Sequence, residues 1–304
     1  MHIGNGIICP VTGIPMLAIA GVTAFYAYKK AKQEFSKDKI LPTVALTGLV
    51  FALQMINFAI PTTGSSGHII GAILLSSLLG ANVAFLAMCS ILIVQSVFFA
   101  DGGLLALGCN IFNMGFLACF VAYPLLFKPL EKINKPVLGA ILSSIVALQL
   151  GSIAVVAEGA LSGTITLSAL LNFTALMQTI HLPIGIAEGL VTGLIVGVAK
   201  IDNMKKLSYS LGAISILLAG VISHFASAKP DGLEWSLLNI SDSVIMQTQG
   251  MLFNVSENLQ HNLSVLAQMP STLGSVAGLF VVVGFMYLIC LFMDRKTVMV
   301  NNEK

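Results

Sequence analysis

The sequence predicts an all-α membrane protein with about nine transmembrane helices. Of its 304 residues, 57% are hydrophobic and only 9% are charged, whereas soluble domains carry about 25% charged residues. Apolar runs recur along the chain at about the 20-residue length that a helix needs to cross a bilayer, where lipid offers backbone groups no hydrogen-bond partner. The runs lack the alternation of a membrane β-barrel, so helices are the expected spanning elements.

Nine apolar segments are the candidate spans. The third is short for a straight crossing at about 1.5 Å per residue, so a tilted, shortened or re-entrant helix is open there. The seventh contains "HLP", where Pro183 is expected to kink or break the helix. In order, the segments are Val11–Tyr28, Leu41–Ile60, Ile69–Gly80, Val83–Ala100, Leu104–Phe127, Val137–Ala157, Leu170–Ala199, Leu207–Phe225 and Leu273–Met293.

The basic residues predict the orientation of the chain. Lys and Arg concentrate in cytoplasmic loops. Five lysines lie in 29–39, three in 128–135 and three in 200–206, and Arg295, Lys296 and Lys304 follow the last segment. With nine crossings these fourteen residues fall on one side and only Lys229 falls on the other. We therefore expect the amino terminus outside the cell and the carboxyl terminus in the cytoplasm.

The first two residues, "MH", form a potential metal chelate. The α-amine of Met1, the amide nitrogen of His2 and the imidazole Nδ1 of His2 can close a five-membered and a six-membered ring on one ion. A second imidazole would complete a planar set of four nitrogens, the geometry associated with Ni(II) or Cu(II). His68, in the outside loop "IPTTGSSGHII", is the available fourth ligand. The alternative interpretations are that His2 is only a polar residue at a membrane entry, or that residues 1–20 are a signal peptide. No Lys or Arg precedes Lys29, which argues against the signal peptide.

Five ordered motifs then resemble one known family. They are "MHI" at the start, "FALQMINFAIPTTGSSGHIIGAILLSSLLG" at 51–80, "FFADGGLLALGCNIFNMGF" at 98–116, "AEGALSGT" at 157–164 and "HLPIGIAEGLVTG" at 181–193. Together they are similar to the substrate-binding M component of cobalt/nickel energy-coupling-factor (ECF) transporters (CbiM/NikM). The resemblance implies a seven-helix core whose first helix carries the amino terminus into the metal pocket, with Met1, His2 and His68 as ligands. Asn5 stands where many relatives have an acidic residue.

The rest of the chain resembles the small N component, which some members carry as a fusion. Its marks are "ISHFASAKPDGLEWSL", a polar outside segment and a final span. We thus expect a metal-binding M-type component at 1–206 and an N-type component with two helices at 207–304. Within 226–270, Pro230, Asp231 and Gly232 are typical of a turn, and the segment as a whole has the composition of a solvated loop.

The resemblance also implies partners and a cellular location. The chain has no phosphate-binding loop of the form G-x-x-x-x-G-K-[ST], so ATP hydrolysis is expected of separate subunits. These would be a transmembrane coupling (T or Q) subunit and ATP-binding (A or O) subunits, in a prokaryotic plasma membrane. Ni(II) or Co(II) would be the transported substrate, and no bound organic cofactor is expected.

Polar residues inside the apolar segments are further candidates. Ionisable groups at membrane depth are costly and are usually functional, so Glu188 either makes a coupling contact or is satisfied by a neighbouring helix. Side-chain amides in these segments are candidates for hydrogen bonds between helices or for orienting a metal-bound imidazole. These amides are Gln54, Asn57, Gln95, Asn110 and Asn113.

A competing function is an intramembrane serine protease. "GSSG" at 64–67 would supply Ser66 as the nucleophile, and His181 would act as its base. The metal interpretation accounts for the same loop through His68 and also accounts for "MHI". Cys9, Cys89, Cys109, Cys119 and Cys290 are isolated in the sequence and are expected to be packing thiols.

Overall fold

The computed structural model describes residues 1–198, 204–240 and 248–301, and most of them are helical. The elements are α1 (Pro10–Glu34), η1 (Lys37–Lys39), α2 (Ile40–Gln54), β1 (Phe58–Ala59), β2 (Ser66–Gly67), α3 (Ala72–Leu79), α4 (Ala81–Phe99), α5 (Leu107–Asn110), η2 (Ile111–Phe127), α6 (Lys128–Lys132), α7 (Pro136–Leu161), α8 (Leu170–Val198), α9 (Met204–Gly220), η3 (Ile222–Phe225), α10 (Gly232–Leu238), α11 (Met251–Leu263), η5 (Val265–Gln268) and α12 (Ser271–Asn301).

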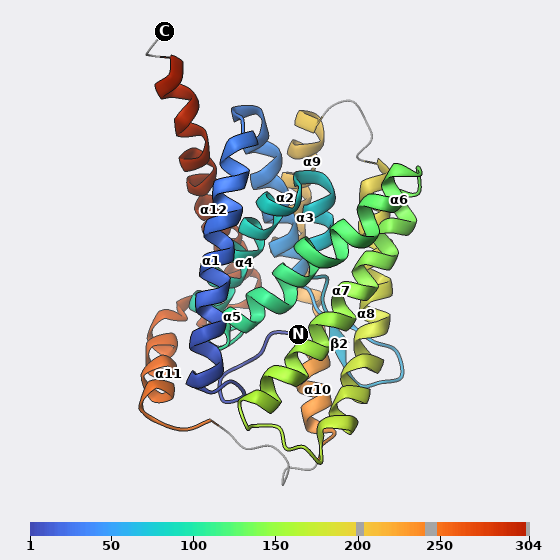
Figure 1. The fold of residues 1–304 in the computed structure, drawn as a ribbon, viewed down its shortest axis with the longest axis vertical. Helices are drawn as coiled ribbons and strands as arrows, with labels where there is room; N and C mark the ends of the chain where they lie inside the picture. The colour runs from blue at the N-terminus through green and yellow to red at the C-terminus, as the bar shows by residue number, and fades with distance from the viewer. Residues whose placement is uncertain (199–203, 241–247, 302–304) are drawn as a thin grey trace.

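The helices form one bundle around a buried apolar core (Figure 1). α7 packs along α8 and along η2, which is π-helical and continuous with α5 and α6. α9 and α12, which come from the carboxyl-terminal third of the chain, pack on α2. The all-α fold predicted from composition and apolar runs is therefore confirmed.

The predicted count of about nine spans is not confirmed. By length and composition, six helices of the described residues can cross a membrane: Pro10–Glu34, Ala81–Phe99, Leu107–Lys132, Pro136–Leu161, Leu170–Val198 and Ser271–Asp294. The other three candidates form α2, α3 and α9, which have 15, 8 and 17 residues. An apolar run overestimates helix length because apolar residues also line buried loops. The run Leu41–Ile60, for example, leaves its helix after Gln54 and enters β1.

Two local predictions are revised. α8 is one helix that continues through Pro183, so of the two predicted outcomes, a kink or a break, the break is excluded. The segment 226–270 is not simply a solvated loop, because it contains α10 and α11, with 241–247 lying outside the described residues. α10 begins with a capping box, in which Asp231 Oδ1 accepts from the amides of Leu233 and Glu234 and Glu234 reaches back to the Asp231 amide.

The loop that carries His68 is ordered by a small hairpin. β1 and β2 pair antiparallel, with Phe58 opposite Gly67 and Ala59 opposite Ser66. The Ser66 amide donates to the Pro230 carbonyl at 2.8 Å, which attaches the hairpin to the residue before α10's capping box. His68 therefore follows a strand that is held in place, although the Gly and Ser residues of the loop would suit a flexible loop.

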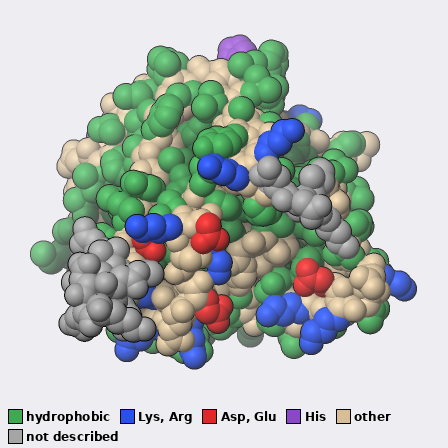
Figure 2. Space-filling view, turned by 90° about the horizontal axis from the view of Figure 1, so that it is seen from above, with side chains coloured by type: hydrophobic (Ala, Val, Ile, Leu, Met, Phe, Trp, Pro, Cys, Tyr) green, Lys and Arg blue, Asp and Glu red, His purple; other side chains and the backbone are tan. Residues whose placement is uncertain are grey.

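One end of the bundle carries the basic residues. Figure 2 views this end, which includes the carboxyl-terminal end of α1 and α6, and shows Lys and Arg side chains gathered there among a few carboxylates. The amino terminus does not lie at this end. Met1 lies inside the bundle, beside α10 and β2 (Figure 1), where it is 4% exposed.

Candidate metal centre

Residues 1–9, which precede α1 and are not helical, run into the interior of the bundle; we call this segment the strap. Ile3 is fully buried, and its backbone is held on both sides. Its amide donates to Asn110 Oδ1 at 2.8 Å, and its carbonyl accepts from the Gly103 amide at 2.8 Å and from Asn110 Nδ2 at 3.2 Å. These bonds fix the direction of the backbone directly after His2.

The α-amine of Met1 faces a carboxylate from the other end of the sequence. It donates to Asp231 Oδ2 at 2.8 Å, and the side chains of the two residues are 2% and 15% exposed. Burial, the largest influence, raises the pKa of the Asp231 carboxyl, but the charge and hydrogen bond of the adjacent ammonium together with the Glu234 amide hold this pKa well below its usual value. The buried amine of Met1 is thus paired with the Asp231 carboxylate.

His2 and His68 lie against one another. Their rings are stacked, with centroids 5.0 Å apart and planes inclined by 27°, and the residues are 8% and 6% exposed. Burial, with the ammonium of Met1, lowers the pKa of each imidazole from 6.5 to about 3. Both rings are therefore neutral at physiological pH, the form in which imidazole binds a metal.

The nitrogen atoms of the two rings differ in their partners. His2 Nε2 lies 3.1 Å from Gln95 Oε1, and His2 Nδ1 lies 3.4 Å from Asp101 Oδ1. His68 Nδ1 lies 3.3 Å from the Ile69 carbonyl, whereas its buried Nε2 has no hydrogen-bond partner in the part of the chain that the structure describes. His68 therefore has a nitrogen available for a ligand.

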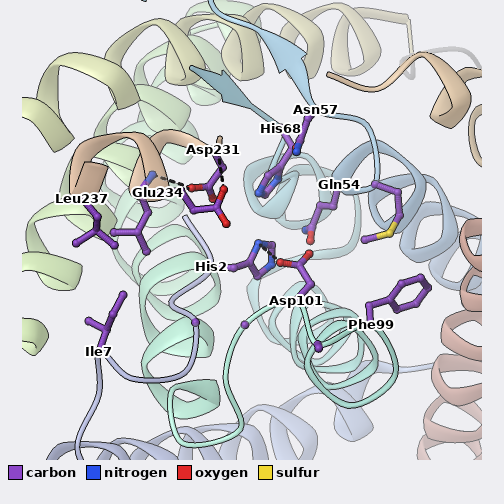
Figure 3. Close-up of a pocket in the computed structure, with 15 residues that line it drawn as sticks. His2, Ile7, Gln54, Asn57, His68, Phe99, Asp101, Asp231, Glu234 and Leu237 are labelled. Carbon is purple, nitrogen blue, oxygen red and sulfur yellow. Dashed lines mark hydrogen bonds and ion pairs between the residues drawn. The ribbon is translucent and has the colours of Figure 1, made fainter. Parts of the chain in front are cut away.

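Both histidines line a cavity of about 430 Å³. Figure 3 shows their rings side by side on its wall, with Asp231 and Glu234 from the start of α10 on one side and Asp101 and Gln54 on the other. Phe99, on the Asp101 side, and Leu237, on the Glu234 side, add apolar surface at opposite sides of the view. The cavity therefore brings together residues from both ends of the chain and from the ends of α2 and α4.

The predicted amide residues divide into two groups. Gln95 contacts His2, Asn110 holds Ile3, and Gln54 Nε2 donates to the Ile70 carbonyl at 2.7 Å while its Oε1 is buried without a partner among the described residues. Asn57 lines the cavity. By contrast, Asn113 Nδ2 donates to Glu158 Oε2 at 2.7 Å, and it makes no hydrogen bond to either histidine within the described residues. Asn113 thus serves helix packing.

Glu188 holds the backbone that follows His68. Its Oε2 accepts from the Ile70 amide at 2.8 Å and its Oε1 from the Gly71 amide at 3.1 Å, and the residue is 1% exposed. Gly71 is the residue before α3 and has a φ of 76°, which favours glycine. The Glu188 carboxylate is therefore satisfied by main-chain groups of the loop after His68.

The protease interpretation has no support in the structure. The Ser66 hydroxyl donates to the Lys229 carbonyl at 2.7 Å. His181 Nδ1 bonds the Met177 carbonyl at 2.7 Å within α8, and its Nε2 has no partner among the described residues. Ser66 therefore does not use His181 as a base. All five cysteines are free and all but Cys9 are buried, in keeping with packing thiols.

Three residues of this site were missed at the sequence level. Asp231 contacts the amine of Met1 and Asp101 contacts His2. Gln260 of α11 is hydrogen-bonded to Asn5 of the strap. Gln260 Oε1 accepts from Asn5 Nδ2, and its Nε2 donates to the carbonyls of Ser96 and Gly102 at 2.8 and 2.7 Å. The D-x-x-E spacing of a capping box at Asp231 was a readable signal. Nothing in the local sequence indicated Gln260.

The side chains alone do not form a metal site. In the described part of the chain, no three His, Cys, Asp or Glu residues are grouped so that they could hold an ion. Any site at His2 and His68 must therefore use main-chain nitrogen, which is what the amine and amide of the first two residues supply. From their stacked arrangement the two rings would have to turn to share one ion.

Comparison with known proteins gave consistent matches. Residues 2–203 match the family model described as "Cobalt uptake substrate-specific transmembrane region", and residues 205–295 match that of the "PDGLE domain". The Cobalt transport protein CbiM of Acetohalobium arabaticum is 34% identical over 211 residues, covering 64% of this chain and 80% of that protein. The Fused nickel transport protein NikMN of Rhodobacter capsulatus is 35% identical over 123 residues, covering 40% and 35% of the two chains.

A solved structure shares the fold. The crystal structure of a truncated transition metal transporter superimposes with a TM-score of 0.58 and 31% sequence identity, covering 66% of this chain and 98% of that chain.

Proposed function

We propose a specific role for this chain. It belongs to the CbiM family of cobalt uptake substrate-specific transmembrane proteins and is a multi-pass membrane protein of metal transport rather than an enzyme. It is the metal-binding subunit of an ATP-driven ECF importer, and Ni(II) or Co(II) is its cargo. The ion is bound by the α-amine of Met1, the amide and Nδ1 of His2 and an imidazole nitrogen of His68.

One observation carries the proposal: the buried rings of His2 and His68 are stacked on the wall of one cavity, and the buried Met1 lines a second, small cavity together with His68. Residues 230 positions apart in sequence contribute to it, since Asp231 holds the amine. Gln95 supports the assignment because a metal-bound imidazole generally donates its second N–H to an acceptor. With Nδ1 on the ion, His2 Nε2 would donate to Gln95 Oε1, which lies 3.1 Å away.

The domain division and the partners form part of the same proposal. The two family matches meet between residues 203 and 205, which supports an M-type component at 1–206 and an N-type component at 207–304. A transmembrane coupling subunit and ATP-binding subunits complete the importer in the prokaryotic plasma membrane. The basic end of the bundle faces the cytoplasm under the positive-inside rule, and the cavity then opens toward the outside.

Metal titration of the purified chain tests the site. With Met1 verified as the free amino terminus, the wild type is expected to bind one Ni(II) or Co(II). His2→Ala and His68→Ala are expected to lose at least a hundredfold in affinity, because each removes a ligand. His224→Ala is the matched control, since His224 is an exposed histidine and should bind as the wild type does. Equal affinity in all four proteins would refute the site.

A further inference from the structure

α11 (Met251–Leu263) is an amphipathic helix whose apolar side is exposed. At roughly 100° of turn per residue, four aliphatic side chains fall within an arc of about 80° on this helix. They are Leu252, Val255, Leu259 and Leu263, which are 55%, 54%, 51% and 39% exposed. We call these four residues the α11 stripe. Exposed apolar side chains that form one row mark a surface for contact with another apolar phase.

The other sides of α11 have different surroundings. Gln260 is 2% exposed and accepts a hydrogen bond from Asn5 of the strap, so its side of the helix packs on the bundle. Asn254, Glu257 and His261 are exposed on the side that faces away from the stripe. α11 therefore has a protein-facing side, a polar side and an apolar side. Among the described residues, only the apolar side is left without an environment that suits it.

The chain after α11 leads directly into a membrane-spanning helix. Residues 264–270 contain η5, which packs against α12. The first part of α12, Ser271–Asp294, is long and apolar enough to cross a membrane. Val265, Met269 and Leu273 are exposed along this connection. Exposed apolar residues thus continue along the chain from the α11 stripe to the lipid-facing surface of α12.

The position of α11 along the bundle also fits the edge of a membrane. Figure 1 shows α11 toward the end of the bundle opposite the basic residues of Figure 2, level with the first turns of α1. α1 is another candidate span, and Val11 and Ile14 in its first turns are 83% and 53% exposed. Apolar surface that suits lipid therefore extends to the level of α11.

The composition of the stripe favours lipid over a second protein. Protein interfaces depend on Trp, Tyr and Arg anchors, whereas the stripe contains only Leu and Val. Interfacial helices instead bury an apolar face at the boundary of headgroups and acyl chains and keep a polar face in water. α11 has no Lys or Arg, so its contact with lipid requires no anionic headgroup. Phosphatidylcholine is therefore a sufficient probe.

We propose that α11 is an interfacial membrane anchor. It lies at the membrane surface at the end of the bundle opposite the basic residues, with the α11 stripe against lipid acyl chains. Leu259 of the stripe is adjacent to Gln260, whose side-chain amide bonds Asn5 and the carbonyls of Ser96 and Gly102. Lipid contact on one side of α11 therefore keeps the Gln260 side against the strap. The membrane thereby helps to order residues 1–9, whichever residues bind the cargo ion.

Quenching by brominated lipid tests the anchor in the full-length chain, reconstituted in phosphatidylcholine vesicles. Leu259→Trp places a fluorophore in the stripe, and Glu257→Trp is the matched control on the polar side of the same helix. Trp235, the single tryptophan of the chain, is a background common to both variants. Brominated phosphatidylcholine should quench the added tryptophan at 259 at least twice as strongly as the one at 257, which aqueous iodide should quench instead. Equal lipid quenching at the two positions would overturn the anchor. A tryptophan at 259 that neither quencher reaches would also overturn it, because protein would then cover the stripe.

Hydrogen exchange tests the link from the membrane to the strap. The double variant Val255→Asn with Leu259→Asn makes the stripe polar and leaves Gln260 unchanged. In the same vesicles, its amides in residues 1–9 should exchange at least fivefold faster than those of the wild type. Asn254→Ser with Glu257→Gln, on the polar side, is the control and should exchange as the wild type does. Equal exchange in the wild type and the stripe variant would overturn the link. Both measurements are made without metal, so a failure of the proposed metal site would leave their results unchanged.

Discussion

Replacing Glu188 by Gln is expected to weaken metal binding without any contact between this residue and the ion. The carboxylate accepts two main-chain hydrogen bonds, from Ile70 at 2.8 Å and from Gly71 at 3.1 Å, in a setting where it is 1% exposed. Gln offers only one acceptor atom, and its NH₂ group would face the second amide. The loop that sets the position of His68 would therefore lose one of its two attachments to α8.

The magnitude follows from these bonds. A hydrogen bond to a charged group contributes about 1.5–3 kcal/mol, so Glu188→Gln should cost about that amount. If the cost falls wholly on the metal-bound conformation, it corresponds to about a 10- to 150-fold loss of affinity. Glu188→Ala leaves both buried amides unpaired, at about 1–3 kcal/mol each, and should also lower the unfolding temperature.

Isothermal titration with Ni(II), paired with thermal unfolding in detergent, separates binding from stability. Glu158→Gln is the control. Glu158 is also a buried glutamate, and its partner is Asn113. Its variant should keep wild-type affinity. An affinity of Glu188→Gln within twofold of the wild type, or an equal loss in both variants, would refute the idea that Glu188 positions His68.

Three more predictions concern the strap and its partners. Adding one glycine before Met1 should abolish binding, because the amine leaves the chelate ring, whereas a carboxyl-terminal tag should not; unchanged affinity would exclude the amine as a ligand. Asp231→Asn should weaken binding severalfold, because a neutral amide would hold the amine of Met1 less firmly than the carboxylate 2.8 Å from it does, and metal titration checks this. The pKa of His2 and His68 is about 3 in the fold and 6.5 when unfolded, so the unfolded chain binds more protons below pH 6.5. Stability should be greatest above pH 6.5 and fall as the pH is lowered toward 3, by up to about 1.4 kcal/mol per pH unit for each imidazole, and less in the double Ala variant.

The composition of the chain was enough to predict the fold class, but not the number of crossings. Apolar residues fill transmembrane helices and buried loops alike, so hydropathy could not tell α2 from the residues that follow it. Pro183 was misleading for a related reason. A proline breaks an isolated helix, but inside a bundle neighbouring helices compensate for the lost hydrogen bond, and α8 continues through it.

The ligand candidates could be read from "MH" and "SGH" because chelate chemistry depends on atoms of adjacent residues. The residues that hold them could not. Asp231 meets Met1 across 230 positions and Gln260 meets Asn5 across 255. Contacts at such separations leave no periodicity or spacing in a single sequence. Asn5 was noted only as a departure from an acidic residue, and its function as an amide partner for Gln260 required the fold.

The strap explains why an N-type segment is useful to a metal site at the opposite end of the chain. First residues of a chain are usually poorly ordered unless they are tied down, yet the chelate needs the amine, the amide and the ring of His2 in one geometry. Residues after 206 supply three attachments to the strap: Asp231 to the amine, the Thr248 amide to the Gly6 carbonyl at 2.8 Å, and Gln260 to Asn5. Removing residues 207–304 should thus preserve every proposed ligand while releasing the strap. Truncation is then expected to retain one metal per chain but to speed its dissociation, measured by competition with a chelator. An unchanged dissociation rate would show that Asn110 and Gly103 order the strap without help.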